Sequence, residues 1–401
     1  MRIVFLTLGY TPDLDGGGYR YATEVAELMA RRGHSVHAIY PNPGDTLPAR
    51  EQRSGVDLHR LARTGGGFHA RWRSANARAR DSVRQLLQDP TPTLLFSHHA
   101  YLAPALEGLP YVMILQGPWA LEHRYALQAR PRGWMRRTVD ALACHFMHRV
   151  ERQAIARARL VYVASEYSRS KLPQWHPGLQ PTVEVIGGGA DLKRFQPPAD
   201  RDALRRERGL APDDVLFLAV RRLDPRMGLT HLVDAFARVA HTHRHAHLAI
   251  AGKGAQKAEL EARIAAAGLS DRARLLGFVA EDELPRLYGA SDCVIMPSLD
   301  LEGFGLATAE ALACGTPVLA SRAGANPELV QPLGEALLFE PASTDSLAEA
   351  LDSVLRGQRP LPHRTRCAEF ARDTFRWERP VEAIERAYPA HAVRGWPENL
   401  S

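Results

Sequence analysis

The chain has 401 residues, of which 45% are hydrophobic and 24% charged, and its formal net charge is +6. This composition is that of an ordinary globular protein, and the length favours two domains that each have their own core. No apolar run approaches the roughly 18–20 residues of a membrane span, and residues 3–8 are too few for a signal-peptide core, so we expect a cytoplasmic protein. The four cysteines are widely spaced and form no zinc pattern, which favours reduced thiols.

Charge is distributed unevenly along the chain. Residues 1–190 carry 24 basic and 15 acidic side chains, whereas the remainder is slightly acidic. A basic first half favours an anionic partner, such as an acceptor, a lipid headgroup or a membrane surface. No motif for sequence-specific nucleic-acid binding is present, so we expect no nucleic-acid partner.

The first half alternates strand and helix patterns. This order predicts a parallel sheet with right-handed crossovers. The predicted strands are 2–8, 35–40, 94–96, 111–115, 160–164 and 182–186, and the predicted helices are 19–32 and 135–159.

The predicted helix 135–159 is amphipathic and basic. Its apolar residues repeat every three to four positions, which predicts a stripe facing the core, and its arginines leave membrane-surface binding as the alternative. The stripe consists of Met135, Val139, Leu142, Phe146 and Val150.

The second half repeats the alternation after a glycine- and proline-rich connection at 187–200. A second doubly wound sheet is therefore predicted. Its strands are 215–220, 247–251, 274–276, 293–296 and 318–321, its helices are 229–240, 256–267, 281–288 and 306–314, and a last helix is predicted at 377–388.

The most informative segment joins strand 293–296 to helix 306–314. Glu302 precedes Gly303 and Gly305, and Glu310 lies one turn inside the helix. A glycine turn before a helix binds anions, because free N–H groups and the positive helix end point at the turn. A carboxylate beside that turn accepts hydrogen bonds from a vicinal diol. Phosphate and diol together indicate a nucleotide, and the second carboxylate indicates a polyhydroxylated group beside it.

This segment resembles the E-x7-E donor site of the retaining glycosyltransferases of family 4, which have the GT-B fold. The flanking residues 311–318, Gly324 and Pro327-Glu328 agree with it, and further landmarks follow in order along nearly the whole chain. The resemblance implies an α/β protein with two Rossmann-like doubly wound parallel-sheet domains that face a central cleft. Residues 1–190 would bind the acceptor, with 377–401 crossing back, and residues 191–376 would bind the nucleotide sugar.

The resemblance also assigns roles to individual residues. Glu302 would face the transferred sugar and Glu310 would hold the ribose hydroxyls, while backbone groups bind the base and phosphates. The expected donor-binding residues are Gly17, Gly18, Gln116, Gly277, Phe278, Val279, Gly303, Phe304, Gly305, Leu306 and Glu310.

Residues 221–228 lie between a strand and a helix, where the family places an arginine and, five residues on, a lysine on the diphosphate. Two such cations stabilise a leaving diphosphate without a metal ion. Arg222 fits the arginine, but Met227 stands where the lysine is expected, and a thioether carries no charge. We interpret Arg226 as the substitute, because a guanidinium binds phosphate with two donors. The alternative is that Arg226 is a surface charge.

Many relatives carry histidine where this chain has Gln116, and an amide binds hydroxyls but does not titrate. His98 and His99 follow another strand and are candidates for the same region. The acceptor-choosing loops, 42–53, 63–73 and 119–137, carry no motif.

We therefore interpret the chain as a metal-independent retaining hexosyltransferase whose catalytic residues are Arg222, Arg226 and Glu302. The nucleotide sugar, UDP-hexose first and GDP-mannose second, is a co-substrate, and no bound cofactor is expected. The acceptor is a glycan, a lipid-linked molecule or a small molecule, and peripheral contact with an anionic membrane is a further expectation. Two alternatives stay open: a nucleotide-sugar 2-epimerase, and a non-catalytic binding or partner subunit, which Met227 and Gln116 favour.

Overall fold

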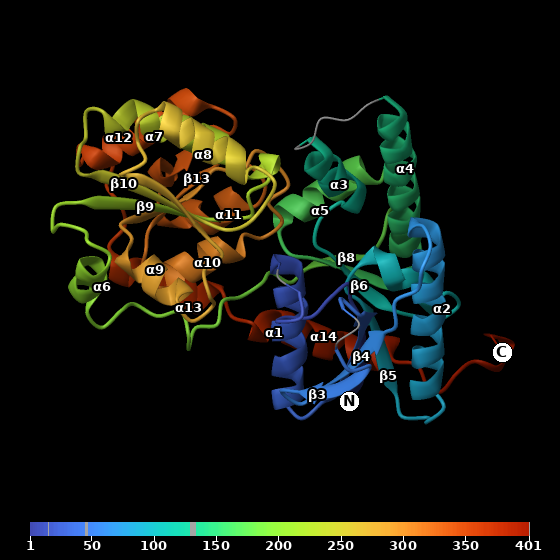
Figure 1. Cartoon of the computed structure of the whole chain (residues 1–401). Helices are drawn as coiled ribbons and strands as arrows, with labels where there is room; N and C mark the ends of the chain where they lie inside the picture. The colour runs from blue at the N-terminus through green and yellow to red at the C-terminus, as the bar shows by residue number, and fades with distance from the viewer. Residues whose placement is uncertain (15, 45–46, 129–133, 401) are drawn as a thin grey trace. The chain divides into compact units, whose positions relative to one another are not determined.

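The structure is a computed structural model, and it describes residues 1–14, 16–44, 47–128 and 134–400. Contacts divide the chain into two compact units, each with its own sheet and hydrophobic core (Figure 1). Unit 1 comprises Met1–Ala120, Val139–Gly188 and Trp377–Ser401, and unit 2 comprises Leu121–Thr138 and Gly189–Arg376. None of the described helices is long and apolar enough to cross a membrane.

Within the described residues, unit 1 contains a sheet of eight strands in the order β3-β4-β2-β1-β5-β6-β7-β8. Neighbouring strands are parallel except β3 and β4, which form an antiparallel hairpin. The hairpin turns at Ser54 and Gly55, both with positive φ, as a two-residue turn of this kind requires. The strands are β1 Arg2–Leu6, β2 Ser35–Pro41, β3 Arg50–Arg53, β4 Val56–Leu61, β5 Thr93–Ser97, β6 Val112–Leu115, β7 Leu160–Val163 and β8 Val183–Val185.

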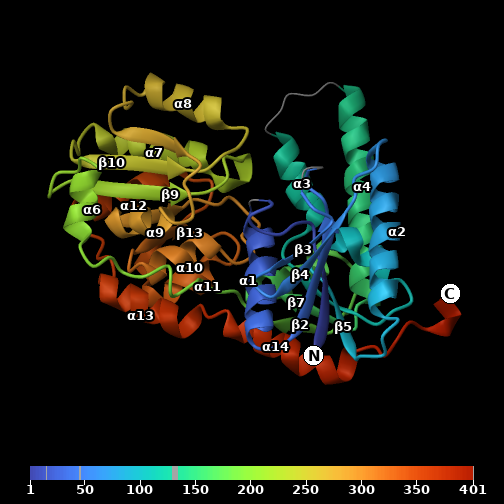
Figure 2. The same cartoon turned by 60° about the horizontal axis from the view of Figure 1, so that its bottom comes forward.

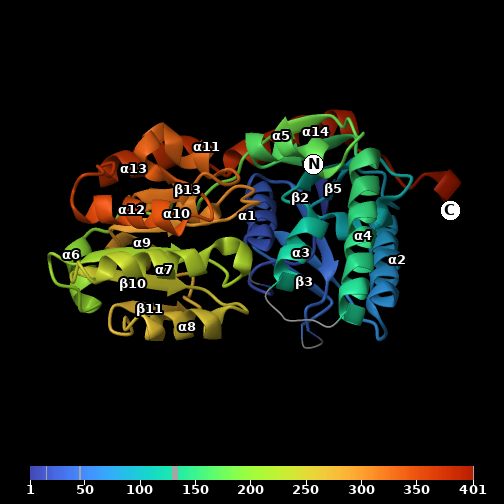
Figure 3. The ribbon, with the colours of Figure 1, turned by 90° about the horizontal axis from the view of Figure 1, so that it is seen from above.

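Helices flank this sheet. α1 contacts α14, whereas α2 and α4 lie side by side (Figures 2 and 3) and contact each other through the rings of Trp72 and Phe146. The C-terminal segment is anchored in unit 1, because Val393 exchanges two backbone hydrogen bonds with Thr93 of β5. The helices of this part are α1 Gly17–Arg31, α2 Phe68–Leu86, α4 Trp134–Arg157, α5 Glu166–Trp175 and α14 Glu378–His391, with the 3₁₀ helices η1 Ala100–Leu106 and η5 Glu398–Leu400. Most of α3, Trp119–Gln128, belongs to the segment Leu121–Thr138 of unit 2.

The predicted core-facing stripe of α4 is wrong in its first half. Val139 and Leu142 are 64% and 66% exposed, whereas Val150 is buried. Phe146 marks the change, since its ring packs edge-to-face against Trp72 of α2 at a centroid distance of 4.9 Å. The stripe is thus covered only from the turn that α2 reaches. The side chain of Met135, the stripe's first predicted member, lies outside the described residues.

The segments expected to be acceptor-choosing loops are partly helix and strand. The prediction that they are loops is therefore wrong in part, whereas their role in choosing the acceptor stays a prediction. Residues 50–53 form β3, residues 68–73 open α2, and α3 occupies residues 119–128. The polar sequence of these segments hides their periodicity, because their buried faces consist of few large apolar side chains.

Within the described residues, unit 2 contains a sheet of six parallel strands in the order β11-β10-β9-β12-β13-β14. All five predicted strands are confirmed, and β14 was not predicted. The strands are β9 Val215–Val220, β10 Ala246–Ala251, β11 Ala273–Gly277, β12 Cys293–Met296, β13 Val318–Ser321 and β14 Leu338–Phe339.

Helices α7, α8 and α12 cover one face of this sheet, and α9, α10 and α13 cover the other (Figures 1 and 2). The helices are α6 Arg201–Glu207, α7 Leu229–Ala240, α8 Lys257–Ala266, α9 Leu284–Ala290, α10 Leu306–Ala313, α11 Asn326–Val330, α12 Thr344–Leu355 and α13 Arg364–Thr374, with the 3₁₀ helices η2 Pro225–Met227, η3 Gln331–Leu333 and η4 Glu335–Leu337.

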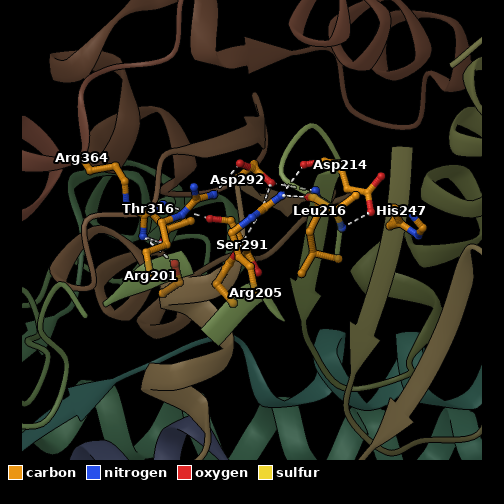
Figure 4. Close-up of polar contacts among 12 residues, drawn as sticks. Arg201, Arg205, Asp214, Leu216, His247, Ser291, Asp292, Thr316 and Arg364 are labelled. Atoms are coloured by element: carbon orange, nitrogen blue, oxygen red, sulfur yellow. Dashed lines mark hydrogen bonds and ion pairs between the residues drawn. The ribbon is translucent and has the colours of Figure 1, made fainter. Parts of the chain in front are cut away.

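A charge network ties the amino ends of the unit 2 strands together (Figure 4). Asp292, just before β12, accepts hydrogen bonds from Arg201 at 2.5 Å, Arg205 at 2.7 Å and the backbone N–H of Leu216 at 2.8 Å. This network joins α6 to β9 and β12. Because the strands are parallel, the opposite edge of the sheet is left for the loops that leave their carboxyl ends.

Candidate active site

Two loops of unit 2 leave the carboxyl ends of adjacent parallel strands. Residues 221–228 follow β9, residues 297–305 follow β12, and β9 pairs directly with β12. The loops approach each other closely at Gly228, which has a φ of +68°, since a Cβ there would lie 1.9 Å from the carbonyl oxygen of Pro297. Only glycine satisfies both the conformation and the contact. The structure therefore brings together both loops that the sequence singled out.

Arg226 holds the second loop in place. Its buried guanidinium donates to the carbonyl oxygens of Asp300 at 3.1 Å and Leu301 at 2.8 Å, and its own carbonyl accepts from the Leu299 N–H at 2.9 Å. Leu301 has a φ of +53°, a conformation that costs a side-chain-bearing residue of the order of 1–2 kcal/mol. The alternative that Arg226 is a surface charge is wrong.

Glu302 lies at the centre of this region. Its Oε2 accepts from Arg221 Nη2 at 2.5 Å and from Ser298 Oγ at 2.8 Å. Burial by itself raises the pKa of Glu302, but the positive charges of Arg221 and Arg226 and the two hydrogen bonds outweigh burial and hold that pKa below its usual value. Glu302 is therefore a carboxylate near neutral pH, and its other lone pairs suit hydroxyl donors.

Gly324 packs against the backbone of Glu302. A Cβ at Gly324 would come within 2.5 Å of the backbone and Cβ of Glu302, and the φ of Gly324 is +61°. The adjacent Ala325 N–H donates to the Glu302 carbonyl at 2.8 Å. The segment after β13 thus fixes the backbone of Glu302.

Arg221 and Arg222 follow β9 directly and differ in their surroundings. The Arg221 side chain is 6% exposed and contacts the sulfur atoms of Met227 and Met296 as well as Glu302. Arg222 is exposed, and within the described part of the chain its side chain has no hydrogen bond or ion pair, although its carbonyl accepts from the Asp224 N–H at 3.0 Å. Sequence reasoning chose Arg222 and missed Arg221, because nothing in the local pattern distinguishes these two consecutive arginines.

The N-terminus of α10 borders the same loop. It begins after Gly305, whose φ is +86°, without a side-chain cap, so the positive helix end is not neutralised by a capping group. Glu310 is 5% exposed on this helix and accepts a hydrogen bond from the Tyr288 hydroxyl at 3.0 Å. Tyr288, on α9, is a contact that sequence reasoning missed, because nothing in the local pattern marks it.

The predicted base-binding residues lie at the end of β11. Gly277 has a φ of +68° and its carbonyl accepts from the Gly252 N–H at 2.6 Å, while Val279 packs partly against the core. Phe278 is 52% exposed, and the ammonium of Lys253 lies 4.2 Å from the centre of its ring. An exposed aromatic ring with a neighbouring cation is suited to a planar or anionic ligand.

In unit 1, the sequence predicted that Gly17 and Gly18 lie in a loop. The structure shows instead that they form the first turn of α1, after β1. A Cβ at Gly18 would lie 2.6 Å from Gln116 Oε1, and Gln116 Nε2 lies 3.0 Å from His98 Nε2. Burial, with a smaller effect of His99, lowers the pKa of His98 to about 3, so His98 is neutral and accepts from the amide. The structure thus brings together Gly18, Gln116 and His98 at one end of the unit 1 sheet.

The unit 2 site combines the exposed guanidinium of Arg222, the uncapped N-terminus of α10, the partly buried carboxylate of Glu302 and the buried carboxylate of Glu310. The first two attract phosphate, and the carboxylates accept hydrogen bonds from sugar hydroxyls. Among the side chains that the structure describes, no group of three or more His, Cys, Asp or Glu residues is arranged to hold a metal ion.

The chain is similar in sequence to several glycosyltransferases. An uncharacterized glycosyltransferase of Methanocaldococcus jannaschii is 26% identical over 88% of this chain and 89% of its own length. A 2-deoxystreptamine glucosyltransferase of Streptomyces kanamyceticus is 31% identical over 59% of this chain and 62% of its own. A GDP-mannose-dependent monoacylated alpha-(1-6)-phosphatidylinositol monomannoside mannosyltransferase of Corynebacterium glutamicum is 34% identical over 44% of this chain and 48% of its own. The matches to the last two thus span less than two thirds of their lengths.

Solved structures share the fold. A sucrose-phosphate synthase from Thermosynechococcus elongatus superposes with a TM-score of 0.81 over 97% of this chain and 98% of its own, at 22% identity. Residues 15–194 match the family model for Glycosyltransferase Family 4, and residues 200–374 match the model for Glycosyl transferases group 1. With these two models covering most of both halves, the chain belongs to the family 4 glycosyltransferases and has the GT-B fold.

Proposed function

We propose that this glycosyltransferase moves a hexosyl unit from a nucleoside-diphosphate sugar with retention of configuration at the anomeric carbon. The observation that carries the proposal is that Arg222, Glu302 and the α10 N-terminus belong to two loops that leave the carboxyl ends of paired strands. Cations and helix N–H groups bind a diphosphate, and a carboxylate beside them binds the sugar that the diphosphate carries.

Each group in the site has a distinct proposed role. Glu302 accepts hydrogen bonds from hydroxyls of the transferred sugar, and Glu310, oriented by Tyr288, accepts from the ribose. The backbone at 303–306 meets the phosphates, and the backbone at 277–279 meets the base. In unit 1, Gly17, Gly18 and Gln116 meet polar groups of the substrates, and unit 1 as a whole selects the acceptor.

The transfer step breaks the bond between the anomeric carbon and the phosphate oxygen, and the electron pair leaves with the nucleoside diphosphate. The acceptor hydroxyl oxygen bonds to the same carbon, and its proton passes to the leaving phosphate. Arg222 and the helix N-terminus stabilise the charge that develops on the phosphate, while Arg226 adds positive charge and holds the loop. This stabilisation is electrostatic, and we propose that it works without a metal ion.

For the donor we propose UDP-hexose first and GDP-mannose second. The relatives include a glucosyltransferase and a GDP-mannose-dependent mannosyltransferase, which supports a hexose as the transferred sugar. The test is calorimetry of the purified protein, in EDTA, against UDP-glucose, UDP-galactose, GDP-mannose, ADP-glucose and dTDP-glucose. Selective binding of one donor supports the proposal, and an acceptor screen with that donor then measures release of the nucleoside diphosphate.

The two alternatives give different results in the same experiment. A nucleotide-sugar 2-epimerase releases free nucleotide or an isomerised sugar without any acceptor. A non-catalytic subunit binds the donor without turnover, or binds none of the donors. Absence of binding in a folded sample contradicts the proposed function.

We further propose a cytoplasmic location and peripheral contact of α4 with an anionic membrane, where a lipid-linked acceptor would be available. Val139 and Leu142 lie one helical turn apart and are exposed, and Arg136 and Arg137 are exposed just before them. Apolar side chains beside arginines suit the interface of an anionic bilayer. Flotation with phosphatidylglycerol-containing vesicles should recover the protein, and Val139→Ser/Leu142→Ser should reduce recovery. Equal recovery with neutral phosphatidylcholine vesicles, or of the variant, contradicts this contact.

A further inference from the structure

Arg221 is a buried cation whose hydrogen-bonding capacity is only partly used. Its guanidinium has five N–H donors, yet among the residues that the structure describes the acceptors in contact with it are one carboxylate oxygen of Glu302 and the sulfur atoms of Met227 and Met296. A thioether is a weak acceptor, so the bonds to sulfur leave those donors available to a stronger one. Burying a guanidinium is costly unless strong acceptors satisfy it, and on the side of Met227 and Met296 the contacts of Arg221 are to weakly accepting sulfur atoms.

The backbone of Arg221 is fixed, so the guanidinium is held where it is. The Arg221 N–H donates to the Ala251 carbonyl at 2.9 Å, and a Cβ at Gly252 would come within 1.8 Å of the Arg221 carbonyl oxygen. Gly252, with a φ of +146°, is therefore in close contact with this peptide. A side chain that starts from so well-packed a strand end is preorganised for a ligand.

The position of the guanidinium relative to Met227 is informative. Arg221 Nη2 contacts the sulfur of Met227, which occupies the δ position of that side chain. A lysine at 227 would carry its ammonium one methylene beyond this δ position. The Arg221 guanidinium therefore puts a positive charge beside the end of the uncharged Met227 side chain, in the region that a lysine ammonium there would occupy.

We propose that Arg221 binds the diphosphate of the donor together with Arg222 and supplies the charge that Met227 lacks. The proposal rests on the proposed function. Arg226 is a poorer candidate, because its guanidinium already donates to the carbonyls of Asp300 and Leu301. One side of the planar Arg221 guanidinium donates to Glu302, and the other side would donate to phosphate. The hydrogen-bonded pair of Arg221 and Glu302 would thus bind both the diphosphate and the sugar.

The test compares nucleoside diphosphates with their monophosphates by calorimetry, using UDP and UMP, GDP and GMP, ADP and AMP, and dTDP and dTMP. The ratio of the monophosphate Kd to the diphosphate Kd measures binding of the second phosphate. Arg221→Gly should lower this ratio by about tenfold to a hundredfold, the range for a charge-assisted hydrogen bond, and leave monophosphate affinity little changed. Arg244→Gly, at an exposed turn of unit 2, is the control and should leave the ratio unchanged.

The double variant Arg221→Gly/Met227→Lys separates a phosphate-binding role from a structural one. If Arg221 supplies the missing charge, lysine at 227 should restore the ratio in the double variant. In Arg221→Lys, the ratio should lie between that of the wild type and that of Arg221→Gly. This variant also provides a folded sample if the glycine variant does not fold. An unchanged ratio in folded Arg221→Gly, or no recovery in the folded double variant, overturns the inference. Absence of any diphosphate binding by the wild-type protein overturns the proposed function as well, so the two failures are distinguishable.

Discussion

The guanidinium of Arg226 donates to the carbonyl oxygen of Leu301 at 2.8 Å, and this bond spans 75 positions in the sequence. It holds Leu301 in a left-handed conformation one residue before Glu302. The side chain that the sequence nominated for phosphate binding is therefore also the one that shapes the loop on which Glu302 sits.

Arg226→Met should destabilise the protein by roughly 2–4 kcal/mol, because it leaves the carbonyls of Asp300 and Leu301 without their buried charged donor. Chemical denaturation measures the loss. Arg238→Met is the control, since Arg238 makes an exposed ion pair with Asp345, a kind of pair worth about 0–1 kcal/mol. A similar loss in both variants would show that Arg226 does not clamp the loop.

Gly324→Ala should abolish donor binding. It should also lower the free energy of unfolding by about 2–6 kcal/mol, the sum expected for overpacking and backbone strain. The added methyl group would lie within 2.5 Å of Glu302. Gly268→Ala is a matched control, because Gly268 has a similar φ of +66° but no atom within 4 Å of the added Cβ. It should cost only the strain of about 1–2 kcal/mol. Equal effects of the two substitutions would refute the steric explanation.

The Glu302 ion pair should make stability depend on acid pH. Because the pKa of Glu302 is lower in the folded protein than in the unfolded chain, its contribution is fully present above the unfolded pKa and is lost as pH falls through the folded one. The free energy of unfolding should therefore fall more steeply below about pH 4.5 in the wild type than in Glu302→Gln. Denaturation curves across the acid range test this, and parallel pH profiles would contradict it.

His98 should stay neutral throughout the physiological range. Its pKa is lowered to about 3 by burial, so the unfolded chain takes up a proton at a higher pH than the folded protein does. Stability is then lost progressively as pH falls from the unfolded pKa of His98 toward about 3, and His98→Gln should flatten that part of the profile. Histidine NMR signals report the ring directly, and a protonated His98 near neutral pH would exclude its role as acceptor from Gln116.

Local sequence determined much of the fold. The bounds of β9, α7, β12 and β13 match the prediction, because each is a continuous apolar run or a periodic helix that ends at glycine, proline or a polar residue. The hairpin of β3 and β4 and the helix α2 were missed. The buried residues of α2 are Ala75, Asn76, Ala79 and Val83, and so small and mixed a face gives a weak periodic signal.

The candidate site, too, could be predicted only in part from the sequence. The sequence by itself determined the family and the segment that holds Glu302 and Glu310, because a turn motif followed by a helix is written in consecutive residues. Only the tertiary structure decided what surrounds Glu302: Arg221 is 81 positions away, and Gly324 comes from the segment after β13. Parallel strands bring distant loops to one edge of a sheet, so the partners of a site residue depend on strand order, and no local pattern specifies them.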